Sequence, residues 1–126
     1  MGDKKSEYEE ALEQLDDGEQ PLAYIEGTNE ATSGNGVLIA TGKRLFWFDK
    51  QIFGMKTKKS YAYADFDHVK VEDHGKEFEF KPRSKGFMGV GTKEELEIEN
   101  IKSSDEQKEE FLRVVTQKLA ESAPAE

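Results

Sequence analysis

The most constraining feature of the sequence is a change in hydrophobic period at Pro21. Beyond this residue, short apolar runs alternate with polar residues at a period of two, and clusters of glycine, asparagine, aspartate and serine separate the runs. Such a pattern is typical of half-buried antiparallel strands joined by tight turns. We therefore expect a mainly β protein with seven strands, at residues 22–30, 37–41, 44–49, 57–63, 66–72, 77–81 and 94–101.

Helical patterns flank these strands at both ends. Ser6 and Glu9 form a capping box, after which apolar residues recur at helical spacing as far as Leu15, so we expect a short amphipathic helix there. At the other end, Ser103 or Ser104 caps a second helix, whose apolar stripe consists of Phe111, Leu112, Val115 and Leu119.

The predicted organisation is a single domain over residues 21–121, with a helical extension over 1–20 and a frayed tail over 122–126. The chain has no cysteine, which excludes disulfides, thiolate metal sites and a cysteine nucleophile. The first residues lack the apolar core of a leader, and no apolar run approaches the ~18 residues of a membrane-spanning helix. We therefore expect a cytoplasmic protein.

Charge is distributed unevenly along the chain. The formal net charge is −9, which opposes any uniformly anionic partner. However, the stretch from Lys43 to Lys59 contains six bases and one acid, and the stretch from Lys81 to Lys93 contains four bases and no acid. The rest of the chain is strongly acidic, so the folded protein should have a basic and an acidic side.

The run from Gly36 to Asp49, GVLIATGKRLFWFD, resembles the "G-v-L-x-x-T-x-x-R-L" hairpin of bacterial PH-like and GRAM-type domains. The later segment Ser60–Phe66, SYAYADF, is similar to the strand and turn that follow this hairpin in those domains. The resemblance covers about residues 20–120 and is greatest to the YokE-like group, which also has a helix ahead of its first strand.

This resemblance implies a partly open barrel of seven strands, closed at one end by the C-terminal helix. It also implies a binding or interaction module and not an enzyme. The first strand carries Glu26 and Glu30 but no lysine, which departs from the pattern of phosphoinositide-binding PH domains.

In the PH-like fold, the loops after the third and sixth strands lie at the open end, opposite the C-terminal helix. In this chain both loops combine bases with apolar tips. Such a surface is suited to peripheral contact with an anionic membrane or to a protein partner, unless the tips fold over the core and the lysines form only a solvated rim. The candidate binding residues are Lys50, Phe53, Lys56, Lys58, Lys59, Arg83, Lys85, Phe87 and Lys93.

The third strand is apolar on both faces, because Leu45, Phe46, Trp47 and Phe48 follow one another without interruption. One face belongs to the barrel core, and the other needs a cover. The first helix can supply that cover through Tyr8, Leu12 and Leu15. A partner protein or a bound peptide is the alternative.

Two other functional classes remain open. Basic loops and aromatic strands are also typical of small barrels that bind single-stranded nucleic acid, and that function would need Trp47 or Phe80 to be exposed for base stacking. The acidic net charge makes nucleic acid the less favoured partner. The chain can also form homo-oligomers through an open sheet edge.

No residue pattern predicts catalysis, a cofactor or a metal. His68 and His74 lie six positions apart, which along a strand is about 20 Å and too far for one ion. The spacing of Gly86, Gly89 and Gly91 matches neither a dinucleotide-binding fingerprint nor a phosphate-binding loop.

Overall fold

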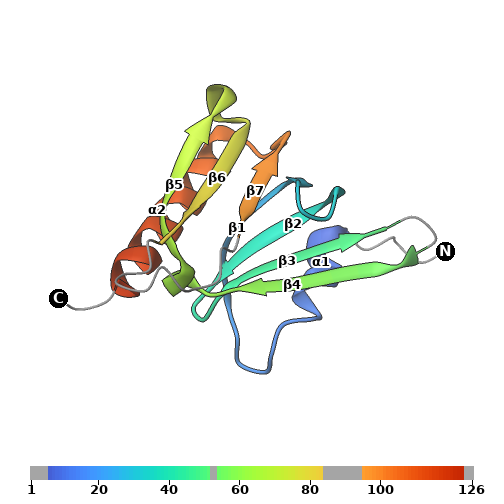
Figure 1. Cartoon of the computed structure of the whole chain (residues 1–126). Coiled ribbons are helices and arrows are strands. Elements are labelled where there is room, and N and C mark those ends of the chain that lie inside the picture. Colours follow the sequence, from blue (N-terminus) through green and yellow to red (C-terminus); the bar gives the residue numbers. More distant parts are fainter. Residues whose placement is uncertain (1–5, 52–53, 84–94, 124–126) are drawn as a thin grey trace.

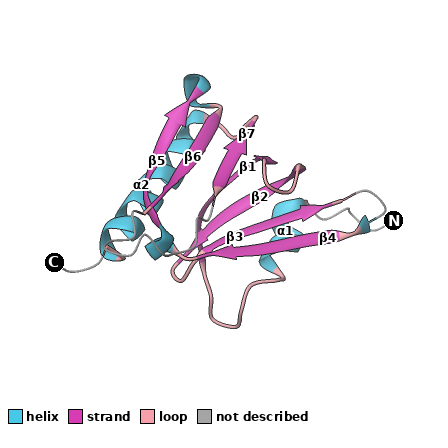
Figure 2. Ribbon diagram, viewed as in Figure 1, coloured by secondary structure: helices cyan, strands magenta, loops and turns pink. Residues whose placement is uncertain are grey.

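The structure, a computed structural model, describes residues 6–51, 54–83 and 95–123. Within these residues, seven strands form one antiparallel sheet in the order β4-β3-β2-β1-β7-β6-β5 (Figures 1 and 2). The strands are β1 (Pro21–Asn29), β2 (Gly34–Thr41), β3 (Leu45–Lys50), β4 (Lys56–Tyr61), β5 (Phe66–Glu72), β6 (Glu77–Pro82) and β7 (Leu96–Glu99). Because the edge strands β4 and β5 do not pair with each other, the sheet forms a partly open barrel.

The strand β1 joins the two halves of the sheet. Along its length it pairs with β2, its neighbour in sequence, and at its end Thr28 lies opposite Glu99 of β7. The hairpins β2-β3 and β3-β4 continue one half, whereas β5, β6 and β7 make the other. The predicted mainly β fold is confirmed.

Two helices pack on this sheet, α1 (Glu7–Leu12) and α2 (Asp105–Glu121). Figure 1 shows α1 beside β3 and α2 alongside β5. Ser104 caps α2 by accepting a hydrogen bond from the Gln107 amide at 3.2 Å, and two acids occupy the first turn, where the helix dipole favours negative charge. No helix in the described part of the chain is long and apolar enough to cross a membrane.

The main hydrophobic core lies inside the barrel, between the two halves of the sheet and α2. Trp47 of β3 has no exposed surface there, and Phe111 of α2 packs against Phe78 and Phe80, with ring centroids 6.2 and 6.3 Å away. The other buried α2 residues are Val114, Val115 and Leu119. The predicted capping of the barrel by the C-terminal helix is confirmed.

A second apolar cluster lies on the outer face of β2 and β3. It consists of Val37, Ile39, Phe46 and Phe48, and Ala11 of α1 is buried against it. Tyr8, Leu12 and Leu15 also pack there, so the first helix covers this face as predicted. However, α1 ends at Leu12, earlier than the pattern indicates, and Leu15 reaches the cluster from the turn that follows.

Six of the seven strands differ from the predicted bounds, and the second and the seventh differ most. The second begins at Gly34 and not at Val37, because Gly34 and Gly36 pair with β1 and let β3 approach closely. A Cβ at Gly34 would lie 2.6 Å from the Asp49 side chain. The seventh strand is shorter than predicted, since Asn100 has a φ of 51° and ends the extended backbone.

Candidate functional site

Three lysines share one face of the β3-β4 hairpin, and we call Lys50, Lys56 and Lys58 the lysine strip. In the ladder, Lys50 lies opposite Lys56, and Lys58 lies opposite Phe48. Because side chains alternate along a strand, the strip faces the same side as Phe48, which is the side covered by α1. The sequence prediction placed these three lysines together, and the structure does so.

Lys59 belongs to the opposite face of β4. It lies across from Trp47 in the ladder, and its ammonium group lies 5.1 Å from the centre of the Tyr61 ring. At this distance the Lys59 ammonium group makes a cation–π interaction with the Tyr61 ring. Lys59 is therefore a neighbour of the lysine strip in sequence but does not extend its surface.

The strip contacts the N-terminal segment at two points. The Lys50 ammonium forms an ion pair with Glu10 of α1, with Nζ and Oε2 2.7 Å apart. Lys58 Nζ donates a hydrogen bond of 3.2 Å to the side-chain oxygen of Gln14, which follows α1. Lys56, at the start of β4, is exposed. Two of the three lysines thus already bind oxygen atoms of the N-terminal segment.

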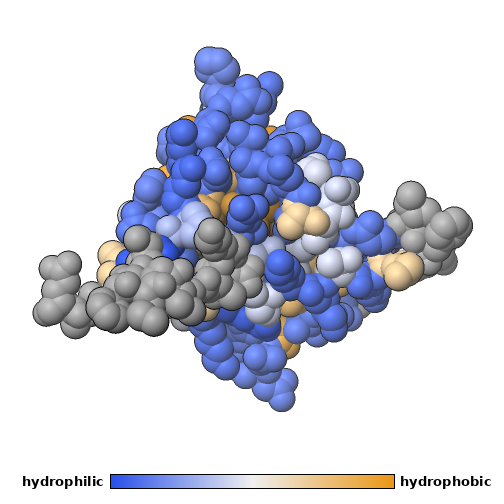
Figure 3. Space-filling model, in the orientation of Figure 1, coloured by the Kyte–Doolittle hydropathy of each residue, from blue (hydrophilic) through white to orange (hydrophobic). Residues whose placement is uncertain are grey.

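An exposed methionine lies next to the strip. Met55 directly precedes β4 and has 68% of its surface exposed, more than any other large apolar residue in the described ranges. Figure 3 shows a mostly hydrophilic surface with small, separate apolar areas. The lysine strip and Met55 therefore combine positive charge with a small apolar surface. Four of the predicted site residues lie outside the described residues: Phe53, Lys85, Phe87 and Lys93.

Arg83 lies at the corner between β4 and β5. Its guanidinium donates hydrogen bonds to the carbonyl oxygens of Ala64 at 2.9 Å and Phe66 at 2.7 Å, and it lies 3.9 Å from the Asp67 carboxylate. The strip lies at the beginning of β4, whereas this corner follows its end. The structure therefore does not bring Arg83 together with the strip and gives it a role in fixing the corner.

Part of the open end carries negative charge. A cavity of about 490 Å³ lies beside the β1-β2 turn and the start of β7, and its lining comprises Glu30, Ala31, Glu79, Phe80, Pro82, Glu95, Leu96 and Glu97. The carboxylates of Glu30, Glu97 and Glu99 lie within 4.8 Å of one another. In the described residues they are the acids close enough to share a cation. Their negative charge makes this part of the surface unfavourable for an anion.

The family model for the bacterial PH domain matches residues 15–117, which is most of the chain. The chain belongs to the bacterial PH domain family. A crystal structure of a pleckstrin homology domain from Shewanella amazonensis SB2B superimposes with a TM-score of 0.55 at 19% sequence identity, covering 88% of this chain and 93% of that one. No curated protein matches.

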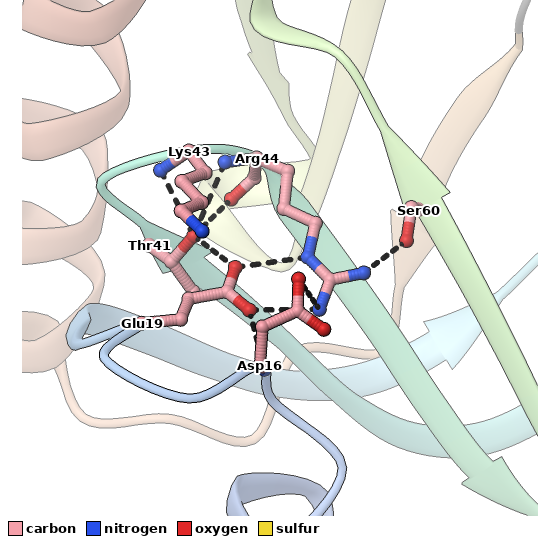
Figure 4. A network of polar contacts seen from close by, with 6 residues as sticks. All are labelled: Asp16, Glu19, Thr41, Lys43, Arg44 and Ser60. Carbon is pink, nitrogen blue, oxygen red and sulfur yellow. Dashed lines mark hydrogen bonds and ion pairs between the residues drawn. The ribbon is translucent and has the colours of Figure 1, made fainter.

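Opposite the lysine strip's end of the hairpin, this PH domain has a buried charged network (Figure 4). The Glu19 side chain is fully buried and accepts hydrogen bonds from Arg44 Nε at 2.9 Å, Arg44 Nη2 at 2.8 Å and the Thr41 hydroxyl at 2.8 Å. The hydrogen bonds from Arg44 lower the pKa of the Glu19 carboxyl to about 2, against the opposing effect of burial.

This network fixes the framework of the PH domain. It joins the segment before β1, which contains Glu19, to the β2-β3 turn, which contains Thr41 and Arg44. Arg44 also donates to Ser60 of β4, and the Tyr63 hydroxyl donates to the Thr41 carbonyl at 2.6 Å. Thr41 and Arg44 belong to the hairpin on which the sequence resemblance rests, and their contacts in this chain are structural.

A second buried carboxylate, that of Asp49, stabilises the hairpin. Asp49 has no exposed surface and accepts hydrogen bonds from the Trp47 indole, from the Thr32 hydroxyl at 2.9 Å and from the Gln51 amide at 2.6 Å. It thereby ties the β1-β2 turn to the end of β3, next to Lys50. No sequence pattern indicates a role for Asp49 or Glu19, since Thr32 and Arg44, which bind them, come from other turns.

Proposed function

We propose that this PH domain is a non-catalytic binding module that contacts an anionic membrane surface through the lysine strip. The observation that carries the proposal is the gathering of Lys50, Lys56 and Lys58 on one face of a hairpin, beside the exposed Met55. Bases near an acidic membrane contribute about 1 kcal/mol each, and an apolar tip adds contact at the acyl boundary. The predicted cytoplasmic location would place the strip opposite an acidic leaflet.

The acidic remainder of the chain determines how such binding works. With a net charge of −9 and the acids Glu30, Glu97 and Glu99 clustered at the open end, most orientations are repelled by an anionic surface. An approach through the hairpin brings the lysine strip towards the anionic surface. Binding should therefore be weak, oriented and sensitive to salt.

The other predicted site residues have graded roles in this proposal. In the sequence, Phe53 lies two positions before Met55, and Lys85, Phe87 and Lys93 lie between the ends of β6 and β7, so we propose that they extend the surface. Lys59 and Arg83 contribute less, because a tyrosine ring and backbone carbonyls already engage their charges.

The test is co-sedimentation of the protein with vesicles at low salt. One set contains phosphatidylcholine alone, and the other contains phosphatidylcholine and phosphatidylserine in equal amounts. We expect binding to the acidic vesicles only, and loss of binding in K56E/K58E. The matched control is K76E/K102E, which makes the same change in net charge at two exposed lysines away from the strip, and it should still bind.

The outcomes separate the candidate partners. Equal binding to both kinds of vesicle, or no binding of the wild type to either, contradicts the membrane proposal. Retention of an acidic protein by the wild type but not by K56E/K58E would then favour a protein partner. Base stacking is not favoured, because Trp47 and Phe80 have 0% and 1% of their surfaces exposed. Homo-oligomerisation through the edge strands stays a prediction.

A further inference from the structure

The lysine strip is already engaged by a carboxylate of its own chain. Glu10 Oε2 lies 2.7 Å from Lys50 Nζ, and the Lys50 side chain keeps 41% of its surface exposed in this pair. A headgroup phosphate or carboxylate that binds Lys50 needs the same ammonium group. Glu10 therefore offers Lys50 the same kind of group as the proposed ligand, an anionic oxygen at ion-pair distance.

We propose that Glu10 acts as an internal competitor that lowers the affinity of the strip for anionic surfaces by holding Lys50. This inference rests on the proposed function. Binding of a surface at Lys50 requires the ammonium to exchange the Glu10 carboxylate for an external anion, whereas Lys56 is exposed and ready for contact. The strip then has a lower affinity than its three lysines would give if α1 carried a neutral residue at position 10.

Glu10 can be neutralised without displacing α1. The helix is anchored by apolar contacts, with Ala11 fully buried and Leu12 packed on the outer cluster. Tyr8 also stacks on Tyr24 of β1, with ring centroids 3.7 Å apart. Ion pairs with a partly exposed lysine contribute little to folding, so the competition can be measured in a folded protein.

The chain offers a matched control one position away. Glu9 is exposed, and its carboxylate accepts a hydrogen bond from the Ser6 hydroxyl at 3.2 Å. Glu9→Gln and Glu10→Gln both remove one negative charge from α1 and preserve side-chain shape. They therefore change the long-range field equally, but Glu10→Gln alone releases Lys50.

The experiment measures affinity for phosphatidylserine-containing vesicles by co-sedimentation at fixed low salt. We expect Glu10→Gln to bind more tightly than the wild type, by up to about fivefold, because the gain is limited by the free energy of the ion pair that it removes. Glu9→Gln should change affinity by less than about twofold, because the Glu9 carboxylate is exposed and engages Ser6, not Lys50. In a Lys50→Gln background, Glu10→Gln should no longer have any effect beyond that of Glu9→Gln.

A second comparison does not depend on any change in α1. Because Lys50 is held by Glu10 and Lys56 is not, Lys50→Gln should reduce vesicle affinity less than Lys56→Gln does. Equal effects of Glu9→Gln and Glu10→Gln on a wild type that does bind, or a larger loss for Lys50→Gln than for Lys56→Gln, would overturn the competitor role and leave the proposed function standing. Failure of the wild type to bind acidic vesicles would remove the proposed function itself.

Discussion

Arg44 and Glu19 form a two-point ion pair, in which Nε lies 2.9 Å from Oε2 and Nη2 lies 2.8 Å from Oε1. The Glu19 side chain has no exposed surface, and the Arg44 side chain is 21% exposed. A buried carboxylate needs such partners, because removal from water otherwise costs several kcal/mol. The pair therefore makes the docking of the N-terminal segment depend on the ionised state of Glu19.

Acid should destabilise the domain through this pair. The pKa of Glu19 falls from 4.5 to about 2 on folding, so its contribution is complete above pH 4.5 and is lost as the pH falls towards 2. The full contribution is on the order of 3 kcal/mol. Denaturant unfolding at a series of pH values should show this loss, and Glu19→Gln should remove this part of the acid sensitivity.

The matched control for that experiment is Glu110→Gln. Glu110 also forms a two-point pair with an arginine, Arg113, and the hydrogen bonds from Arg113 also lower its pKa, but the pair is exposed. Solvent screening should make its contribution small. If Glu110→Gln and Glu19→Gln change the pH dependence of unfolding equally, burial is not what makes the Glu19 pair important.

Truncation of Phe111 tests the role of α2. This side chain is fully buried against Phe78 and Phe80, so Phe111→Ala should reduce the free energy of unfolding by about 3 to 5 kcal/mol. Urea denaturation followed by circular dichroism measures the change. An unchanged midpoint would mean that α2 does not close the barrel core in solution.

The chain has a single tryptophan, so its fluorescence reports one site. Trp47 is inaccessible to solvent, and we expect a blue-shifted emission that iodide does not quench in the native protein. Unfolding in urea should shift the emission to the red and restore quenching. Ready quenching of the native state would show an exposed indole and would revive the nucleic-acid interpretation.

Two glycines make a steric comparison. A Cβ at Gly27 of β1 would lie 2.7 Å from the Glu99 carbonyl oxygen, whereas one at Gly42 in the β2-β3 turn has no atom within 4 Å. Gly27→Ala should destabilise the fold by about 1 to 3 kcal/mol because β1 and β7 must move apart. Gly42→Ala should be close to neutral. Thermal melts of the two variants test the closeness of the β1–β7 contact.

Single lysines should separate the two faces of β4 in vesicle binding. Lys58→Glu and Lys59→Glu change the net charge equally, but Lys58 belongs to the strip and Lys59 lies over the Tyr61 ring. We expect Lys58→Glu to weaken binding to acidic vesicles more, and the difference to shrink as salt screens the surface. Equal losses would mean that overall charge, and not the strip, governs the interaction.

Much of the fold follows from local sequence patterns. The period of two from Pro21 onwards predicts the strands because each strand buries one face, and the Ser104 cap and Phe111 stripe predict α2. The errors have local causes as well. Leu15 lies at helical spacing yet reaches the outer cluster from a turn, and Gly36 carries no hydrophobic signal although it is part of β2.

The candidate site was less predictable because charge alone does not show which lysines are engaged. Adjacency in the hairpin was enough to place Lys56 beside Lys50. Arg83 was assigned to the same surface, but its carbonyl partners come from the β4-β5 corner, which no sequence pattern connects to it. Glu19 is 25 positions from Arg44, so the buried pair also had no local signal.

The pairing of β1 with both β2 and β7 has a consequence for synthesis on the ribosome. The first four strands and α1 are contiguous in sequence, so this half, with its outer cluster, can assemble as soon as Tyr61 has emerged. The inner face of this half, with Trp47, stays uncovered until β7 and α2 have been synthesised. Thr28 likewise cannot pair until Glu99, near the other end of the chain, has emerged. Contacts between residues so far apart in sequence form late. A nascent chain stalled before α2 would therefore expose an apolar sheet face, to which chaperones bind.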